Sequence, residues 1–175
     1  MKMIYDDLKA CDVENPSFKD LVFYFFTHPE FKVVFYYRIY SSWYQKGGFK
    51  KALGKYLWMR VVKNSGCYIS PKAKIGKGLR LPHATGIVIG DGAIIGDNAL
   101  IYQHVTIGDK GSGDEYPMLK DNVTIYAGAC VVGSVTLHDD VVIGANAVVL
   151  HDIPAQSTAV GVPAKILKKD MMQAI

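Results

Sequence analysis

The sequence lacks the features that mark several large classes of protein. Its three cysteines among 175 residues are scattered and odd in number, so neither a disulfide framework nor a zinc motif is expected. Its net charge of +4 is too small to indicate nucleic-acid binding. It has no uncharged run long enough to span a bilayer, and its first residues, with Lys2, Asp6 and Asp7, are unlike a signal peptide. A reducing cytoplasm is therefore the expected compartment.

The dominant feature of the sequence is a six-residue repeat that runs from about residue 69 to 153. An aliphatic residue returns at most sixth positions, and glycine often follows it, as at Gly90, Gly96 and Gly108. A fixed short period of this kind indicates a solenoid, because it fits neither the helical period nor simple strand alternation. The aliphatic positions are Ile69, Ile75, Leu81, Ile89, Ile95, Ile101, Ile107, Leu119, Ile125, Val131, Leu137, Ile143 and Val149.

The repeat predicts a mainly β fold, a left-handed parallel β-helix with a triangular cross-section. Each unit would give one short strand and one corner, with the aliphatic side chain inside the prism and glycine or asparagine at corners of positive φ. Three units would close one coil, and coils would stack at about 4.8 Å. We expect a helical region over residues 1–62, the β-helix over 63–167 and a short tail over 168–175.

The N-terminal region holds most of the aromatic residues and predicts several helices. Asn15-Pro16 and Gly47-Gly48 interrupt its apolar pattern, and Thr27-His28-Pro29-Glu30 is typical of a helix start. We expect these helices to cap the open first coil and to contact neighbouring chains. An alternative is that their aromatic residues and lysines also rest on the inner face of the membrane.

Two irregularities interrupt the six-residue spacing. Two extra residues fall near Ile87-Val88-Ile89, after the first coil, and the spacing doubles between Ile107 and Leu119. Much of the second gap must leave the prism, which predicts a loop over residues 109–118. Because solenoids often place function on such excursions, we expect this loop to border the functional site.

A stack of outward positions indicates where chemistry could occur. By register, His83, Gln103, Ala127 and Ala145 should form one column on one face. An imidazole suits proton abstraction near neutral pH, and the small residues beyond it would leave a backbone track for a long thin ligand. His83 is therefore the candidate base, with His104 as the second candidate. These two histidines lack tight metal-ligand spacing, so no metal site is expected.

Three motifs resemble the serine acetyltransferase family of hexapeptide-repeat acyltransferases. They are LPHATGIVIG at Leu81–Gly90, VTIG at Val105–Gly108 and GVPAKIL at Gly161–Leu167. The likeness extends from about Asp6 to Lys169, which is nearly the whole chain. It implies transfer of an acetyl group from acetyl-CoA to a hydroxyl, in a homotrimer with active sites between adjacent prisms.

The resemblance also implies roles for single residues. His83 matches the general base, which would deprotonate the acceptor hydroxyl as that oxygen attacks the thioester. The implied cofactor contacts comprise a loop residue at the thiol end, two alanines beside the pantetheine arm and two lysines near the phosphates. These residues are Asp109, Ala127, Ala145, Lys165 and Lys168.

The acceptor side departs from the family pattern. The family's aspartate before the base is here Pro82, its Arg-His pair in the loop is Glu115-Tyr116, and its imidazole-orienting aspartate is Tyr68. A zwitterion needs a partner for each of its charges, and the matching residues are absent. We therefore predict a sugar hydroxyl, bound by Asp114, Glu115, Tyr116 and Tyr68, because this pattern resembles the colanic acid and capsule acetyltransferases of surface polysaccharide synthesis.

Two alternatives remain open. A serine O-acetyltransferase of cysteine biosynthesis would require a rebuilt binding site for the amino acid. A non-catalytic trimeric scaffold would keep the prism without the reaction. The substitution at Tyr68 favours the scaffold, whereas retention of His83 with Lys165 and Lys168 argues against it.

Overall fold

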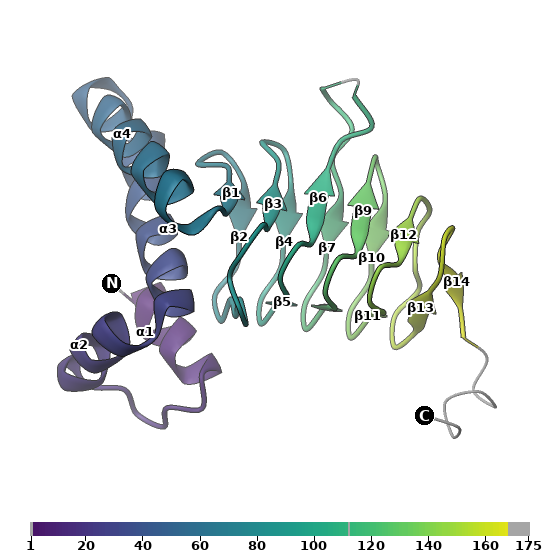
Figure 1. The fold of residues 1–175 in the computed structure, drawn as a ribbon, viewed down its shortest axis with the longest axis horizontal. Coiled ribbons are helices and arrows are strands. Elements are labelled where there is room, and N and C mark those ends of the chain that lie inside the picture. Colours follow the sequence, from purple (N-terminus) through teal and green to yellow (C-terminus); the bar gives the residue numbers. More distant parts are fainter. Residues whose placement is uncertain (1, 112, 168–175) are drawn as a thin grey trace.

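The computed structural model describes residues 2–111 and 113–167, with the helices at one end of a row of coils (Figure 1). The helices lie between residues 2 and 65, so the last one continues three residues beyond the helical region predicted over residues 1–62. Pro29 begins one of the two long helices of the cap from its first position, where proline is well tolerated. In the described part of the chain the helices are α1 (Lys2–Ala10), α2 (Phe18–Thr27), α3 (Pro29–Gln45) and α4 (Gly48–Ser65).

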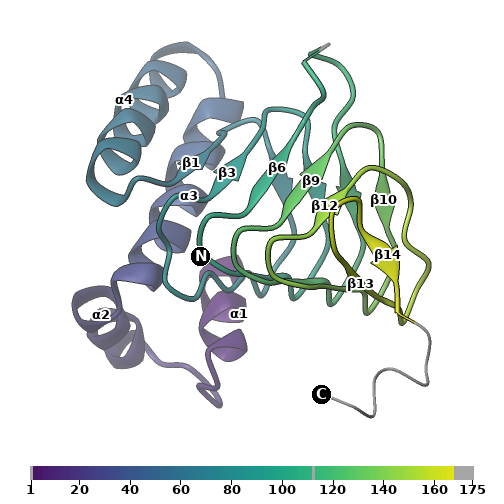
Figure 2. The same cartoon turned by 45° about the vertical axis from the view of Figure 1, so that its right-hand side comes forward.

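Short strands follow the helices and stack coil upon coil, as Figure 2 shows from a second direction. They are β1 (Tyr68–Ile69), β2 (Lys74–Ile75), β3 (Val88–Ile89), β4 (Ile94–Ile95), β5 (Leu100–Ile101), β6 (Thr106–Gly108), β7 (Met118–Leu119), β8 (Thr124–Ile125), β9 (Cys130–Val132), β10 (Thr136–Leu137), β11 (Val142–Ile143), β12 (Val148–Val149), β13 (Thr158–Val160) and β14 (Lys165–Ile166).

The strands form three sheets, which are the three faces of a prism. One face contains β1, β3, β6, β9 and β12, a second contains β2, β4, β7 and β10, and the third contains β5, β8, β11, β13 and β14. Neighbouring strands are parallel, except that β14 runs antiparallel to β13. In a regular coil a residue pairs with the residue eighteen positions later, as Val88 does with Thr106. The structure thus confirms the predicted parallel β-helix of hexapeptide repeats.

The interior of the prism is filled by the repeat itself. All the aliphatic repeat positions are buried, and the small residues beside them, such as Ala93 and Ala99, are fully buried as well. At one corner Asn98 and Asn122 adopt left-handed backbone angles, and the Asn98 side chain donates a hydrogen bond to Oδ1 of Asn122 at 3.1 Å. The short polar side chains that tolerate this conformation therefore also link successive coils.

Helix α3 covers the open edge of the first coil, where backbone carbonyls would otherwise lack partners. The hydroxyls of Tyr37, Tyr40 and Ser41 each donate to a carbonyl of that coil, at 2.8, 2.8 and 3.1 Å. Because unpaired buried carbonyls are costly, these bonds fix the helix to the prism. The accepting carbonyls are, in the same order, those of Ala73, Ile69 and Pro71.

A buried ion pair joins α1, α3 and the first coil. Nε and Nη2 of Arg38 both donate to the Asp7 carboxylate at 2.9 Å. The same guanidinium donates to the carbonyls of Ile75 and Gly76 at 2.7 and 2.6 Å. Asp7 also accepts from the Leu79 N–H at 3.0 Å. The side chains of Arg38 and Asp7 are only 7% and 1% exposed, so this network is sheltered from water.

The predicted excursion leaves the prism between β6 and β7 (Figure 1). It returns through Tyr116, whose ring lies against the backbone of Gly90 and Gly92, where an added β-carbon at either glycine would collide with the ring. These glycines are needed for the close approach. No helix in residues 2–111 and 113–167 is long and apolar enough to cross a membrane.

Candidate active site

His83 lies in a corner of the first coil that is longer than the equivalent corner of the next coil. Arg80 pairs with Leu100, and Val88 pairs with Thr106. Arg80 and Val88 of the first coil are therefore eight positions apart, whereas their partners in the second coil, Leu100 and Thr106, are six positions apart. The two extra residues fall within the turn that contains His83, before the strand rather than inside it.

Because of this insertion, the first residue of the predicted column is Thr85 instead of His83. Backbone hydrogen bonds stack Thr85 on Gln103, Ala127 and Ala145, so the expectation that His83 heads the column is wrong. The extra residues displace His83 into a bulge at the column's end. The bonds run from the N–H groups of His104, Gly128 and Asn146 to the carbonyls of Thr85, Gln103 and Ala127, at 2.9, 3.0 and 2.9 Å.

His83 is exposed and has a left-handed φ of 54°. His104 has a similar φ of 58° at the next corner, so this angle belongs to the fold and does not single out His83. Tyr68 packs edge-on against Trp58 of α4, with ring centroids 5.2 Å apart. No described residue makes a hydrogen bond with the His83 imidazole, which leaves it accessible to a ligand.

His83 opens onto a cavity of about 580 Å³ between the first coil, the start of α3 and the end of α4. Glu30 and Lys32 supply a carboxylate and an ammonium group to this cavity, and Tyr36 and Asn64 add polar groups. Tyr68 does not line this cavity. A base, a carboxylate and a cation therefore border one space, a combination that sequence reasoning missed.

A smaller cavity of about 210 Å³ adjoins the same turn at Pro82. It is lined by Cys11, Arg80 and Glu30, so Glu30 borders both cavities. Burial raises the pKa of the Cys11 thiol, although Arg80 acts in the opposite sense. The thiol therefore stays protonated near neutral pH, which makes it a poor nucleophile.

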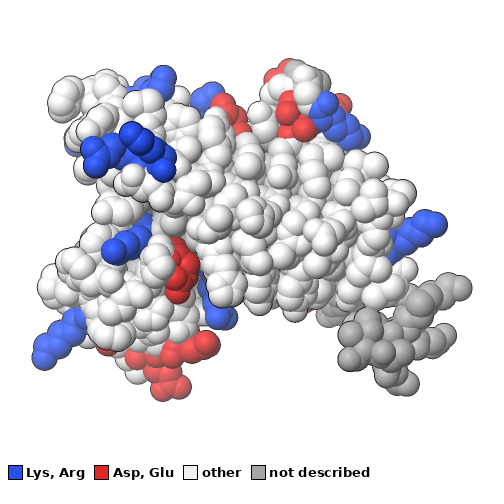
Figure 3. Space-filling view, in the orientation of Figure 1, with Lys and Arg blue, Asp and Glu red and all other residues white. Residues whose placement is uncertain are grey.

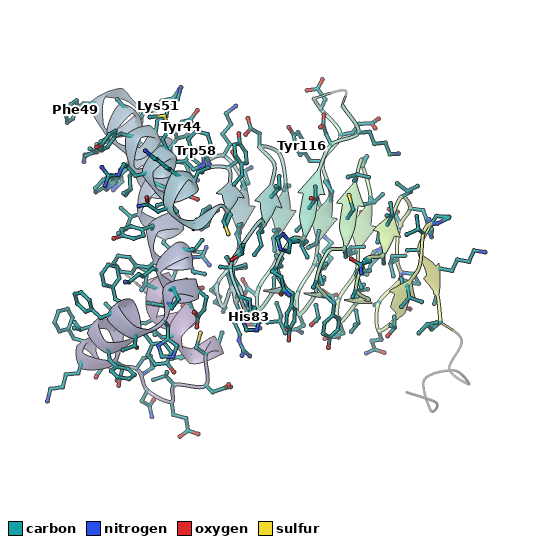
Figure 4. All side chains as sticks on the ribbon, viewed as in Figure 1. Tyr44, Phe49, Lys51, Trp58, His83 and Tyr116 are labelled. Carbon is teal, nitrogen blue, oxygen red and sulfur yellow. The ribbon has the colours of Figure 1, made fainter. Side chains whose placement is uncertain are left out.

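The predicted acceptor residues of the loop lie elsewhere in the same chain. Asp114, Glu115 and Tyr116 belong to the corner between β6 and β7, whereas His83 precedes β3. Figure 4 shows Tyr116 and His83 on opposite sides of the prism. None of the three loop residues lines the cavity of His83. Within one chain, the loop and His83 do not form a single site.

The predicted cofactor residues are spread along the prism. Ala127 is half-buried and Ala145 exposed in the column, and Lys165 is exposed on β14. The Asp109 carboxylate accepts a hydrogen bond from the Gly113 N–H and is thereby held within the loop. Lys168 lies outside the described residues.

Two features of this column were not anticipated. The rings of Tyr102 and Tyr126 stack with centroids 5.1 Å apart, immediately before Gln103 and Ala127. Oε1 of Gln103 is buried without a hydrogen-bond partner among the described residues. An unpaired buried acceptor costs about 1–3 kcal/mol, so a ligand N–H would be favoured beside Gln103.

The chain is similar to several known proteins. The family described as "Bacterial transferase hexapeptide (six repeats)" matches residues 116–151. Serine acetyltransferase of Staphylococcus aureus (strain N315) is 37% identical over 177 residues, which cover 97% of this chain and 80% of that protein. Serine acetyltransferase of Buchnera aphidicola is 38% identical over 170 residues, covering 95% of this chain. The chain spans 64% of the length of the Buchnera protein.

Solved structures of the same name are also similar. Soybean serine acetyltransferase complexed with serine has a TM-score of 0.84 and 33% identity, covering 95% of this chain and 68% of that one. A serine acetyltransferase in complex with CoA has a TM-score of 0.83 and 32% identity, covering 95% and 68%. With its repeats, its helical cap and this degree of identity over almost all of its length, the chain belongs to the serine acetyltransferase family of hexapeptide-repeat proteins.

Proposed function

We propose that the chain is an acetyl-CoA-dependent O-acetyltransferase whose acceptor is L-serine. The observation that carries this proposal is the cavity in which His83 meets both a carboxylate, Glu30, and a cation, Lys32. Relatives named serine acetyltransferase support the donor and the acceptor, and related structures hold CoA or serine.

The proposed reaction is a direct transfer with His83 as general base. The neutral imidazole takes the proton of the serine hydroxyl while the oxygen attacks the carbonyl carbon of the thioester. The carbon–sulfur bond then breaks, and the imidazolium returns its proton to the departing CoA thiolate. The protonated Cys11 thiol gives no support for an acetyl-cysteine intermediate. No step uses a metal ion.

We propose that the donor lies along the column that begins at Thr85. Ala127 and Ala145 offer backbone groups and little side-chain bulk to a pantetheine arm, and the unpaired Oε1 of Gln103 could accept from one of its amides. Asp109 would border the thiol end, and Lys165 with Lys168 would meet the phosphates.

We propose a homotrimer, because the loop and His83 occupy different corners of one prism. Closed cyclic symmetry can place the loop of one copy beside His83 of the next. Asp114, Glu115 and Tyr116 would then reach the acceptor from a neighbouring copy.

A sugar acceptor, as the sequence favoured, is the second candidate. The loop carboxylates and Tyr116 support it, since hydroxyl-rich sugars suit such groups. It is less well supported because the relatives reported above are named for serine, and because a neutral sugar would leave Glu30 and Lys32 unpaired. A non-catalytic scaffold is also less well supported, since the chain retains a base beside a cavity.

The test is turnover of acetyl-CoA with L-serine and with a panel of sugars and lipid-linked glycans. We expect L-serine to be the best acceptor, and we expect His83→Ala to lower kcat about 100- to 10,000-fold while cofactor binding by calorimetry is retained. A glycan with higher kcat/KM than L-serine would refute the serine proposal. Absence of acetyl-CoA binding would favour the scaffold.

We further propose that the cytoplasmic face of the membrane is a secondary contact of this protein. Phe18, Phe23 and Phe26 are 68%, 58% and 71% exposed on α2, and Phe49 is 83% exposed on α4. Figure 3 shows Lys and Arg over the upper and outer parts of the helical end, with Asp and Glu at its lower edge, while the visible face of the prism carries little charge. Exposed aromatic residues beside basic ones suit an anionic lipid surface.

A further inference from the structure

The family's serine-binding charges are absent from their usual positions, yet the structure supplies both signs of charge from another element. Glu30 and Lys32, in the first turn of α3, line the same cavity as His83. We infer that Glu30 binds the ammonium group and Lys32 the carboxylate of an amino-acid acceptor. This inference rests on the proposed transfer to L-serine and specifies how the acceptor is held.

Glu30 is placed to meet a cation from the cavity. It is half-buried and borders both cavities at the Pro82–His83 turn. Among the described residues that line these cavities, it is the only carboxylate. It makes no ion pair with any residue in 2–111 or 113–167. A glutamate in a first turn also stabilises its helix, but that role does not require the side chain to border a cavity with the candidate base.

Lys32 is held by aromatic rings and has no carboxylate partner among the described residues. Its Nζ lies 5.4 Å from the ring centroid of Phe25 and 5.9 Å from that of Phe26. Such rings attract the ammonium without accepting its hydrogen bonds as an anion would. The donors of Lys32 therefore remain available to a carboxylate in the cavity.

The spacing of the two charges keeps them apart. Residues two positions apart on a helix do not face each other, and no ion pair joins Glu30 to Lys32 within residues 2–111 and 113–167. An amino acid carries its ammonium and carboxylate on one carbon, and serine carries its hydroxyl on the next. Glu30, Lys32 and His83 thus offer one partner to each of the three polar groups of serine.

The test compares Glu30→Gln and Lys32→Gln with the wild type on three acceptors. L-serine has both charges, 3-hydroxypropionate lacks the ammonium, and ethanolamine lacks the carboxylate. We expect each substitution to raise KM for L-serine about 10- to 100-fold, as for the loss of a charge-assisted hydrogen bond. Glu30→Gln should leave 3-hydroxypropionate unaffected, Lys32→Gln should leave ethanolamine unaffected, and KM for acetyl-CoA should not change in either.

Arg80→Gln is the matched control, because Arg80 lines the smaller cavity but not that of His83. An effect of Arg80→Gln equal to that of Lys32→Gln would overturn the assignment of the cation. A KM for L-serine within about 3-fold of wild type in both test variants would overturn the inference while leaving serine transfer intact. Circular dichroism melts would confirm that each variant is folded.

Calorimetry with L-serine separates failure of the binding site from failure of the proposed reaction. Binding by the wild type that weakens in Glu30→Gln supports the inference even where no turnover is seen. Absence of L-serine binding to the wild type, with acetyl-CoA bound, would overturn the inference.

Discussion

Replacement of Arg38 by methionine should strongly destabilise the protein. The change removes two hydrogen bonds to Asp7 and two to the carbonyls of Ile75 and Gly76. It leaves a carboxylate that is 1% exposed and that, among the described residues, keeps only the Leu79 N–H as a hydrogen-bond donor. Removing one member of a buried ion pair typically costs about 3–5 kcal/mol. This is a large share of the free energy of unfolding of a typical domain, which is about 5–15 kcal/mol.

The assay is thermal and urea unfolding followed by circular dichroism. For a chain of this length 1 kcal/mol shifts Tm by about 2–4 °C, so we expect Arg38→Met to lower Tm by about 6–20 °C. Protomer concentration must be equal in all samples, because assembly adds to apparent stability. The control is Arg60→Met on α4. Arg60 is exposed, and in the described part of the chain its guanidinium bonds only to the Tyr56 hydroxyl, at 3.4 Å. This substitution should shift stability by no more than about 0.5 kcal/mol.

A double variant identifies the cause of the loss. Asp7→Leu combined with Arg38→Met removes the uncompensated charge together with the cation. We expect it to recover part of the stability, because apolar replacement of a whole buried ion pair is often neutral, whereas the carbonyls of Ile75 and Gly76 and the Leu79 N–H still lose their partners. An Arg38→Met protein within about 1 kcal/mol of wild type would refute the reasoning.

Two further predictions concern assembly and the membrane. Co-expression of His83→Ala with Tyr116→Ala chains in equal amounts should give mixed trimers with about a quarter of wild-type activity. A site built from two copies is intact only when one copy supplies an unaltered His83 and its neighbour an unaltered Tyr116. Light scattering that shows a monomer would contradict this prediction. Phe26→Ser should reduce sedimentation with phosphatidylglycerol vesicles but not change the weak binding to phosphatidylcholine, while equal sedimentation of variant and wild type would remove the membrane proposal.

The fold was predictable because the repeat encodes its own core. Each aliphatic position is buried, since a six-residue period sends one side chain into the prism per corner. The length of a single corner was not predictable in the same way. Two extra residues near Ile87 could be placed in the strand or in the turn before it, and only the pairing of Val88 with Thr106 decides between them. His83 consequently leaves the column.

The acceptor side was harder to predict for two physical reasons. Glu30 and Lys32 line the same cavity as His83 because α3 packs on the first coil, and no local pattern encodes this meeting of segments about fifty residues apart. The separation of Tyr116 from His83, in contrast, follows from their different places in the sequence of repeat units. The sequence alone could have predicted this separation. The loop follows the first of the three repeat units of its coil, whereas His83 lies in the third unit of its own coil.

The hydroxyl and guanidinium donors of α3 have a consequence for solubility. A stack of parallel coils ends in a row of unpaired backbone groups, which is a template for adding another strand from a second molecule. By covering the carbonyls of Ile69, Ala73 and Ile75, α3 blocks growth of the stack in that direction. Damage to this helix should therefore first reveal itself as fibrous aggregation, with prisms joining end to end before their interiors unfold.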